Sequence, residues 1–413
     1  MRDKHQVTEE PCEFKGSSTV LKTSEFREEL AEFTRSCQDA IEAIFLAIRA
    51  KPKFVLDADL EKCFDRIDHE KLLRKINTFP TIRRQLRSWL KAGVLDNKQL
   101  FATSEGTPQG GVISPLLANI ALHGMEERIK QFAEILPGNK QNNRNSVSLI
   151  RYADDFVILH KDITVVQRCR EIITEWLKDM GWELKPSKTR LAHTLDKYEQ
   201  EEPGFDFRGF TIRQYTVGKY HSKQGFKTII APSKKKQKVH YDNLARIIEA
   251  HKAAPQEALI SRINPIIRGW ANYYATVVSK ETYSELDHLM YQKLRAWGKH
   301  RHPNKGRYWV TDKYWHKEGG ENWVFATKDT DRLTRLLCHS DTPIVRHVKV
   351  KGESSPYDGN LVYWSSRMGK NPEMPNRVSK LLKQQKGICT HYGLYFREND
   401  VLEVDHIIPK SQG

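Results

Sequence analysis

Residues 149–159 have the sequence LIRYADDFVIL, in which two adjacent acids, Asp154 and Asp155, stand between apolar flanks. This pattern predicts a tight β-hairpin with both carboxylates at its turn. Residues 54–59, FVLDAD, are typical of a short buried strand that ends in carboxylates and is followed by a turn into a helix. Each acidic segment by itself is more often a turn or a helix cap than a metal site.

The electrostatics of these acids favour a metal site. Buried or half-buried carboxylates repel one another unless cations neutralise them. If the two segments meet, Asp59, Asp154 and Asp155 form an oxygen-rich site suited to Mg²⁺. Two such ions about 3.5–4 Å apart would activate an attacking hydroxyl and stabilise a departing pyrophosphate.

A glycine-rich segment, EGTPQGGVISPLLANI at 105–120, separates the two acidic stretches. Ser114 and Pro115 predict a helix N-cap and first helical position, with apolar residues of the helix on a buried stripe. The glycines let the backbone approach a ligand closely, and a helix N-terminus favours phosphate. An ordinary glycine-rich loop before a core helix is the alternative interpretation.

The chain after the hairpin continues to alternate strands and helices. Residues 176–184 predict a helix and then a strand, 185–189 a basic turn, and 207–212 another short strand. This alternation indicates an α+β sheet domain.

Net charge is unevenly distributed along the 413 residues. The total is +16, residues 1–204 are neutral, residues 205–307 carry +13 and residues 308–413 carry +3. A local basic segment suits a polyanion, with nucleic acid first and an anionic membrane surface second. Within it, helical apolar spacing predicts a helix bundle, and aromatics stand among basic residues that can stack on bases and neutralise phosphates. A solvated charged face would have much the same composition.

The start of the sequence and its cysteines give no indication of secretion. No apolar run reaches about 18 residues, and Met1 is followed by charged and polar residues, which predicts a chain that is not secreted and does not span a membrane. The six cysteines are sparse and never two residues apart, which fits a reducing compartment.

Five motifs together resemble group II intron reverse transcriptases, also called intron-encoded maturases. They are VLDADLEKCFDRI at 55–67, GTPQGGVISPLLANI at 106–120, LIRYADDFVIL at 149–159, LKPSKT at 184–189 and FRGF at 207–210. The resemblance implies the α+β palm of a right-hand polymerase with an antiparallel sheet, an α-helical thumb called domain X, and a partial HNH segment. Its expected boundaries are residual fingers at 1–50, palm at 51–215, thumb at 216–310, a DNA-contacting region at 311–385 and a partial HNH endonuclease at 386–413.

The resemblance assigns roles to individual residues of the palm. Asp59 matches the first catalytic carboxylate, because Phe64 stands five residues later, where the family has the bulky residue that screens the sugar 2′ position. Asp154 and Asp155 match the second and third metal ligands. Asp57 points to the same strand face but does not match the catalytic position, so we expect a supporting role for it.

Further residues are expected at the nucleotide. Leu60, Gln109 and Gly110 would line the nucleotide and template side together with Phe64, and Lys188 would assist pyrophosphate departure.

The tail of the chain resembles the start of an HNH endonuclease, with His406 as the general base and Asp405 as a ligand of a further divalent metal. The sequence departs from that pattern, because Cys389 has no paired cysteine and the motif is cut short at Gly413. We therefore expect an inactive nuclease. Residues 1–32 also lack the long fingers of the family, and we expect the chain to be truncated at both ends and polymerisation to be impaired.

The resulting functional hypothesis is a Mg²⁺-dependent RNA-directed DNA polymerase with a maturase role. Its partners would be group II intron RNA, a DNA target or primer and deoxynucleoside triphosphates, in a bacterial cytoplasm or an organellar matrix. One alternative is a non-catalytic RNA-binding remnant that helps the intron fold, and the last is an HNH DNA endonuclease.

Overall fold

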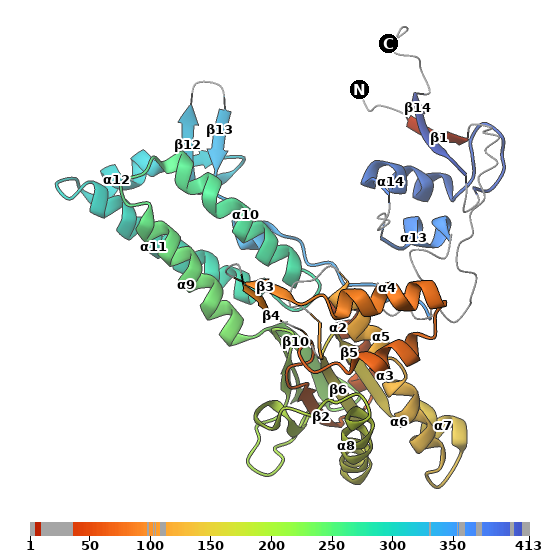
Figure 1. Ribbon diagram of the computed structural model, residues 1–413. Coiled ribbons are helices and arrows are strands. Elements are labelled where there is room, and N and C mark those ends of the chain that lie inside the picture. Colours follow the sequence, from red (N-terminus) through yellow and green to blue (C-terminus); the bar gives the residue numbers. More distant parts are fainter. Residues whose placement is uncertain are drawn as a thin grey trace.

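The computed structural model describes residues 5–9, 36–96, 99–101, 103, 105–107, 113–329, 332–352, 354, 360–368, 374–396 and 400–406. We name three parts: the palm unit, residues 36–233; the thumb unit, residues 234–341; and the C-terminal unit, residues 360–406. The thumb unit and the C-terminal unit extend from the palm unit as two separate arms (Figure 1).

A four-stranded antiparallel sheet forms the centre of the palm unit, in the order β5-β6-β2-β7. Side chains alternate between the faces of β2, so that Leu56 and Ala58 lie on one face while Val55, Asp57 and Asp59 lie on the other. The strands are β2 (Phe54–Asp59), β5 (Ser148–Tyr152), β6 (Asp155–His160) and β7 (Arg190–His193).

Helices cover the face of the sheet that carries Leu56. Leu56, Phe156 and the fully buried Trp182 belong to one apolar core with residues from these helices, and α8 packs directly against β2 and β6. The helices of this part are α3 (His69–Ile76), α4 (Pro80–Leu90), α5 (Ser114–Leu122), α6 (Met125–Glu134), α7 (Lys140–Ser146) and α8 (Ile163–Lys178), and a small hairpin is formed by β3 (Val94–Asp96) and β4 (Gln99–Phe101).

The opposite face of the sheet packs against α2 (Cys37–Ile48) and a second antiparallel sheet. Val55 and Val157 share this second core with Ile44 and with Tyr274 from the thumb unit. The thumb base is therefore part of the palm core. The second sheet has the order β10-β9-β8, with β8 (Phe205–Phe207), β9 (Phe210–Thr216) and β10 (Phe226–Pro232).

The thumb unit is a helical arm with a small sheet at its far end (Figure 1). Ser233 caps the first helix by accepting a hydrogen bond from the Lys236 N–H. A third apolar core joins the helices to the sheet β11-β12-β13. The elements are α9 (Lys234–Ala250), α10 (Gln256–Tyr274), α11 (Lys280–Arg301), α12 (Arg307–Tyr314), β11 (Trp315–Glu318), β12 (Glu321–Asp329), β13 (Arg332–Arg335) and the 3₁₀ turn His339–Asp341.

The chain returns from the thumb unit along α2 before it enters the C-terminal unit. Asp39 of α2 accepts hydrogen bonds from the His347 Nε2 (2.9 Å) and the Val350 N–H (2.8 Å), and Arg367 forms an ion pair with it (3.2 Å). Although burial opposes ionisation, these hydrogen bonds lower the pKa of Asp39 to about 2. The C-terminal unit has α13 (Leu361–Met368), α14 (Asn376–Gln385) and β14 (Leu402–His406), and β14 pairs with β1 (His5–Glu9).

Two local predictions need correction. The helix α5 begins at Ser114 itself and its N-cap is Ile113, so Ser114 is not the cap that we expected. Residues 207–212 are not one strand, because Arg208 and Gly209 both have positive φ values, 50° and 88°, and form a turn between β8 and β9. Two successive residues in that conformation match a hairpin turn and are incompatible with an extended strand.

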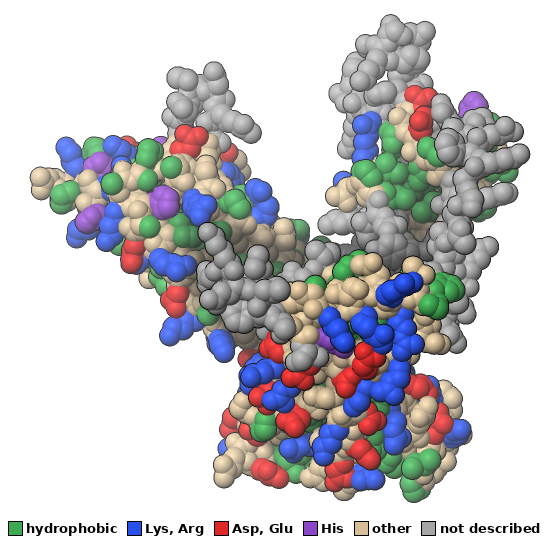
Figure 2. Space-filling view, in the orientation of Figure 1, with side chains coloured by type: hydrophobic (Ala, Val, Ile, Leu, Met, Phe, Trp, Pro, Cys, Tyr) green, Lys and Arg blue, Asp and Glu red, His purple; other side chains and the backbone are tan. Residues whose placement is uncertain are grey.

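Charge is distributed differently over the two arms and the base. On the face shown in Figure 2, Lys and Arg mix with Asp and Glu over the palm unit, and basic side chains gather on the thumb unit. Among the described helices, none combines the length and the apolar character needed to cross a bilayer.

Candidate active site

The palm sheet brings three acids together at one end of its central strands. Asp59 ends β2 and lies opposite Asp155, the first residue of β6. Asp154 belongs to the two-residue turn between β5 and β6, in which Ala153 adopts a positive φ of 55°. One carboxylate oxygen from each of the three acids lies within 4.8 Å of the others. Such an arrangement of hard oxygen ligands suits a divalent cation such as Mg²⁺.

Two basic side chains contact this carboxylate cluster. The Lys188 Nζ donates to the Asp59 Oδ2 at 2.5 Å, and the Arg208 Nη1 donates to the Asp155 Oδ2 at 2.7 Å. The hydrogen bond with Asp59 raises the pKa of Lys188. Burial raises the pKa of the Asp155 carboxyl, although Arg208 opposes this effect. Positive charge therefore already compensates part of the repulsion among the acids.

Asp57 lies on the same face of β2, two residues before Asp59. Burial raises the pKa of Asp57 to about 7, and the neighbouring Asp155 and Asp206 add to the increase, while Arg190 opposes it. Arg190 is itself paired with Glu201 at 3.1 Å. The carboxyl of Asp57 therefore changes its protonation near neutral pH.

A glycine holds the loop that follows β2 and carries Phe64. The Gly106 N–H donates to the Ile67 O at 2.8 Å, and the Thr107 N–H donates to the Phe64 O at 2.6 Å. Gly106 has a φ of +79°, and a Cβ atom there would lie 2.5 Å from the Asp65 O. Only glycine fits this close approach without strain. The first glycine of GTPQGG thus fixes the position of Phe64, which is half-buried against the palm core.

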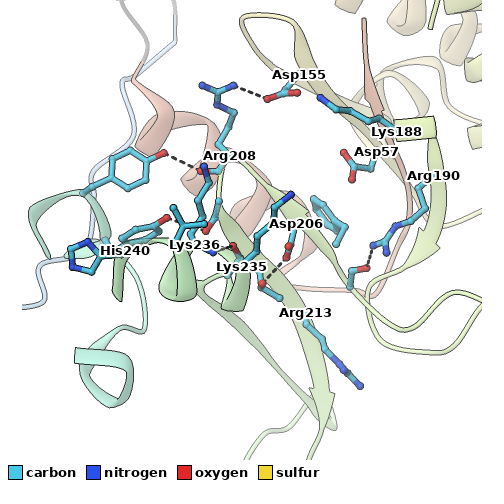
Figure 3. A pocket seen from close by; sticks show the side chains of 18 of the residues that line it. Asp57, Asp155, Lys188, Arg190, Asp206, Arg208, Arg213, Lys235, Lys236 and His240 are labelled. Atoms are coloured by element: carbon cyan, nitrogen blue, oxygen red, sulfur yellow. Dashed lines mark hydrogen bonds and ion pairs between the residues drawn. The ribbon is translucent and has the colours of Figure 1, made fainter. Parts of the chain in front are cut away.

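A cleft of about 1620 Å³ opens in front of the acids. Asp57, Asp59 and Asp155 line one side, and the first turns of α9 and the end of α10 line another (Figure 3). The basic residues of its walls are Lys188, Arg190, Arg208, Arg213, Lys235, Lys236 and Arg246. An acidic end beside basic walls can hold a cation and the phosphates of a nucleic acid at the same time.

Comparison with known proteins identifies the family. Residues 12–241 match the family model described as "Reverse transcriptase (RNA-dependent DNA polymerase)". The chain belongs to the reverse transcriptase family. Residues 237–315 of the chain match a second model, "Group II intron, maturase-specific domain", which includes most of α9 and all of α10, α11 and α12. The predicted relationship to group II intron reverse transcriptases is confirmed, and so is a palm-like fold with mixed helices and sheets.

Individual relatives match only part of their length. The "Group II intron-encoded protein LtrA" of Lactococcus lactis subsp. cremoris is 41% identical over 100 residues, which cover 24% of this chain and 16% of that protein. "Protein YkfC" of Escherichia coli (strain K12) is 29% identical over 212 residues, which cover 43% of this chain and 52% of that protein. The matched region therefore spans about half or less of these curated relatives.

Among solved structures, a telomerase from Candida albicans in complex with a fragment of telomeric RNA is similar to this chain, with a TM-score of 0.35 and 13% sequence identity. The match covers 70% of this chain and 49% of that chain.

The residues predicted at the nucleotide site differ in where the structure places them. The backbone of Leu60 forms a β-bridge with Leu184. Its side chain is buried in the palm core and so does not face the cleft. Phe64 is half-buried on the loop after β2. Gln109 and Gly110 lie outside the described residues, and their assignment stays a prediction.

The predicted nuclease also stays a prediction. Cys389 is a buried free thiol, and the side chain of His406 lies outside the described residues. Within the parts of the chain that the structure describes, the three palm acids form the only group of three or more possible ligands, and none lies in the C-terminal unit.

Sequence reasoning missed the contacts of Arg208. This residue was expected inside a strand of the FRGF motif, yet it lies in a turn and reaches Asp155, 53 positions earlier in the chain. A signal existed, because a residue followed by Gly between two apolar residues is typical of a hairpin turn. The roles of Tyr273 and Tyr274, which donate hydrogen bonds to the same turn, carried no such signal.

Proposed function

We propose that this chain is an RNA-directed DNA polymerase of a group II intron, which uses two-metal nucleotidyl transfer and also assists the intron RNA as a maturase. The observation that carries the proposal is the cluster of Asp59, Asp154 and Asp155, with carboxylate oxygens within 4.8 Å of one another at the end of a basic cleft. The family membership supports the same reaction.

The palm residues would divide the reaction among them. Asp59, Asp154 and Asp155 would hold Mg²⁺, which when bound activates the primer hydroxyl and stabilises the departing pyrophosphate. Lys188 lies beside Asp59, where its ammonium group would neutralise charge on the triphosphate. Phe64 would exclude the 2′ hydroxyl of a ribonucleotide, because Gly106 and Thr107 fix its loop.

The thumb would supply the RNA-binding part of the function. Its maturase-specific segment lies in the stretch of highest positive charge, and α9 presents Lys235, Lys236 and Arg246 to the cleft. These side chains would contact phosphates of the template, the primer or the intron RNA. Such binding weakens steeply with salt because counterions are released from the nucleic acid.

Primer extension on an RNA template with Mg²⁺ and deoxynucleotides tests the proposal. We expect extension by the unchanged chain and a loss of at least about 100-fold in Asp154→Asn, since a metal ligand is removed without a change in side-chain size. The matched control is Asp179→Asn, an exposed acid at the end of α8, which should extend the primer like the unchanged chain. Equal extension by Asp154→Asn and the unchanged chain would refute the site assignment.

The same samples distinguish the non-catalytic alternative. RNA binding that is salt-sensitive and unaffected by Asp154→Asn, together with no extension by any variant, would leave an RNA-binding maturase and reject the polymerase. Splicing of a group II intron RNA with and without the protein would then measure the maturase role directly.

A further inference from the structure

Arg208 occupies a position where the local backbone disfavours it. The turn between β8 and β9 has positive φ at both central residues, 50° at Arg208 and 88° at Gly209. Turns of this kind prefer Asn, Asp or Gly at the first central position, because a longer side chain on an L-residue is crowded in the left-handed region. An unfavourable residue at such a point is a reason to look for a function of its side chain.

The thumb holds this turn in place. The Tyr273 hydroxyl donates to the Arg208 O at 3.1 Å, and the Tyr274 hydroxyl donates to the Gly209 O at 3.2 Å. A Cβ atom at Gly209 would lie 2.9 Å from the Tyr274 hydroxyl oxygen, so the packing there is close. Both carbonyl groups of the turn are thus fixed by the last residues of α10.

The fixed turn directs the guanidinium at one carboxylate of the cluster. The Arg208 Nη1 lies 2.7 Å from the Asp155 Oδ2, and the guanidinium carbon lies 5.0 Å from the centre of the Tyr152 ring. Figure 3 shows the Arg208 side chain extended to Asp155 across the cleft end. The guanidinium therefore contacts a carboxylate that a metal ion at this site would also need as a ligand.

We propose that Arg208 is a positioning residue that competes with the divalent metal for Asp155 and so sets the metal affinity of the site. This inference rests on the proposed function, because it takes the three acids to be the metal ligands. A bound cation and the guanidinium attract the same carboxylate and repel each other, so each weakens the binding of the other. The site then binds metal less tightly than its three carboxylates alone would.

The turn itself suggests the variant that tests the proposal. Arg208→Asn creates an Asn-Gly pair, which suits this turn, and its short side chain cannot make the ion pair with Asp155. Arg208→Gly also suits the turn and serves if the first variant folds poorly, while Arg208→Lys keeps the charge. Arg213→Gln is the matched control, because Arg213 lines the same cleft but stacks on Tyr215 and points away from the acids in Figure 3.

The measurement is the dissociation constant of Mn²⁺, followed by the electron paramagnetic resonance signal of the free ion and without nucleic acid. We expect Arg208→Asn and Arg208→Gly to bind Mn²⁺ about five-fold more tightly, the factor that corresponds to about 1 kcal/mol for a partly exposed ion pair. Arg208→Lys and Arg213→Gln should stay within about two-fold of the unchanged chain, because one keeps the charge and the other lies away from the acids.

The outcomes separate the two proposals. Suppose that Asp154→Asn weakens Mn²⁺ binding, while Arg208→Asn and Arg208→Gly bind Mn²⁺ as tightly as the unchanged chain or less tightly. This result overturns the role of Arg208 only. Equal tightening in the Arg213→Gln control also overturns it, since the effect would then reflect net charge. If Asp154→Asn binds Mn²⁺ like the unchanged chain, the metal site of the proposed function has failed.

Discussion

Asp57→Asn is expected to stabilise the protein, by an amount that increases with pH. The side chain of Asp57 lines the cleft two residues before Asp59, and burial raises its pKa from 3.8 to about 7. An acid whose pKa is raised by folding stabilises the fold only while it is protonated. That stability is fully present below pH 3.8 and is lost as pH increases through about 7. Asparagine has nearly the same shape and cannot ionise.

The size of the effect follows from the difference in pKa. The shift of about 3 units corresponds to about 4 kcal/mol at pH 8, at about 1.4 kcal/mol per unit. Because Asp57 is half-buried, solvent screening reduces this expectation to about 2–4 kcal/mol. The difference between the variant and the unchanged chain should be below about 1 kcal/mol at pH 4.

Urea denaturation of both proteins at pH 4, 6 and 8, in the presence of EDTA, measures this difference in the free energy of unfolding. EDTA keeps divalent cations from binding to the neighbouring carboxylates. The exposed Asp179→Asn serves as the control and should show no such dependence on pH. A stability difference between Asp57→Asn and the unchanged chain that is the same at pH 4 and pH 8 would contradict the assigned burial of this carboxyl.

Two further predictions concern the supports of the site. Gly106→Ala should lower the free energy of unfolding by about 2–4 kcal/mol in urea, because the residue has a positive φ and the new Cβ meets the backbone of the Phe64 loop. Gly218→Ala, where nothing lies within 4 Å, should change it by less than about 0.5 kcal/mol, and equal effects would reject the explanation. Asp39→Asn should destabilise the fold by about 2–3 kcal/mol at pH 7, because His347 and Arg367 lose a charged acceptor. The pKa of Asp39 is lowered to about 2, so its stabilisation is present above pH 3.8 and is lost as pH falls toward 2. A deficit that persists undiminished at pH 2 would count against this.

The acidic cluster shows how much of the site local sequence patterns predict. Apolar runs with acids at their ends predicted β2 and the β5–β6 hairpin, and the order of motifs predicted that Asp59, Asp154 and Asp155 meet. Period-two and period-3.6 patterns are properties of neighbouring residues, so the sequence carries them directly. The helices of the thumb followed from the same reasoning. The catalytic role of the three acids stays a proposal.

Other features needed the packed molecule. Leu60 stands next to Asp59 in the sequence, yet its side chain lies with Leu56 and Ala58 on the opposite face, and the packing of the helices against that face buries it in the palm core. The capping position before α5 also shifted by one residue, since backbone geometry rather than residue type places a helix start.

The sequence by itself determined the kinds of residues at the site, their order and the elements that carry them. Only the tertiary structure decided their partners and charge states. Arg208 meets Asp155 because a hairpin turn held by Tyr273 and Tyr274 aims it there, and the pKa of Asp57 is raised because the packing of the sheet partly buries its carboxyl. Contacts between distant residues and the loss of hydration depend on how the elements pack, and no local pattern of residues contains that information.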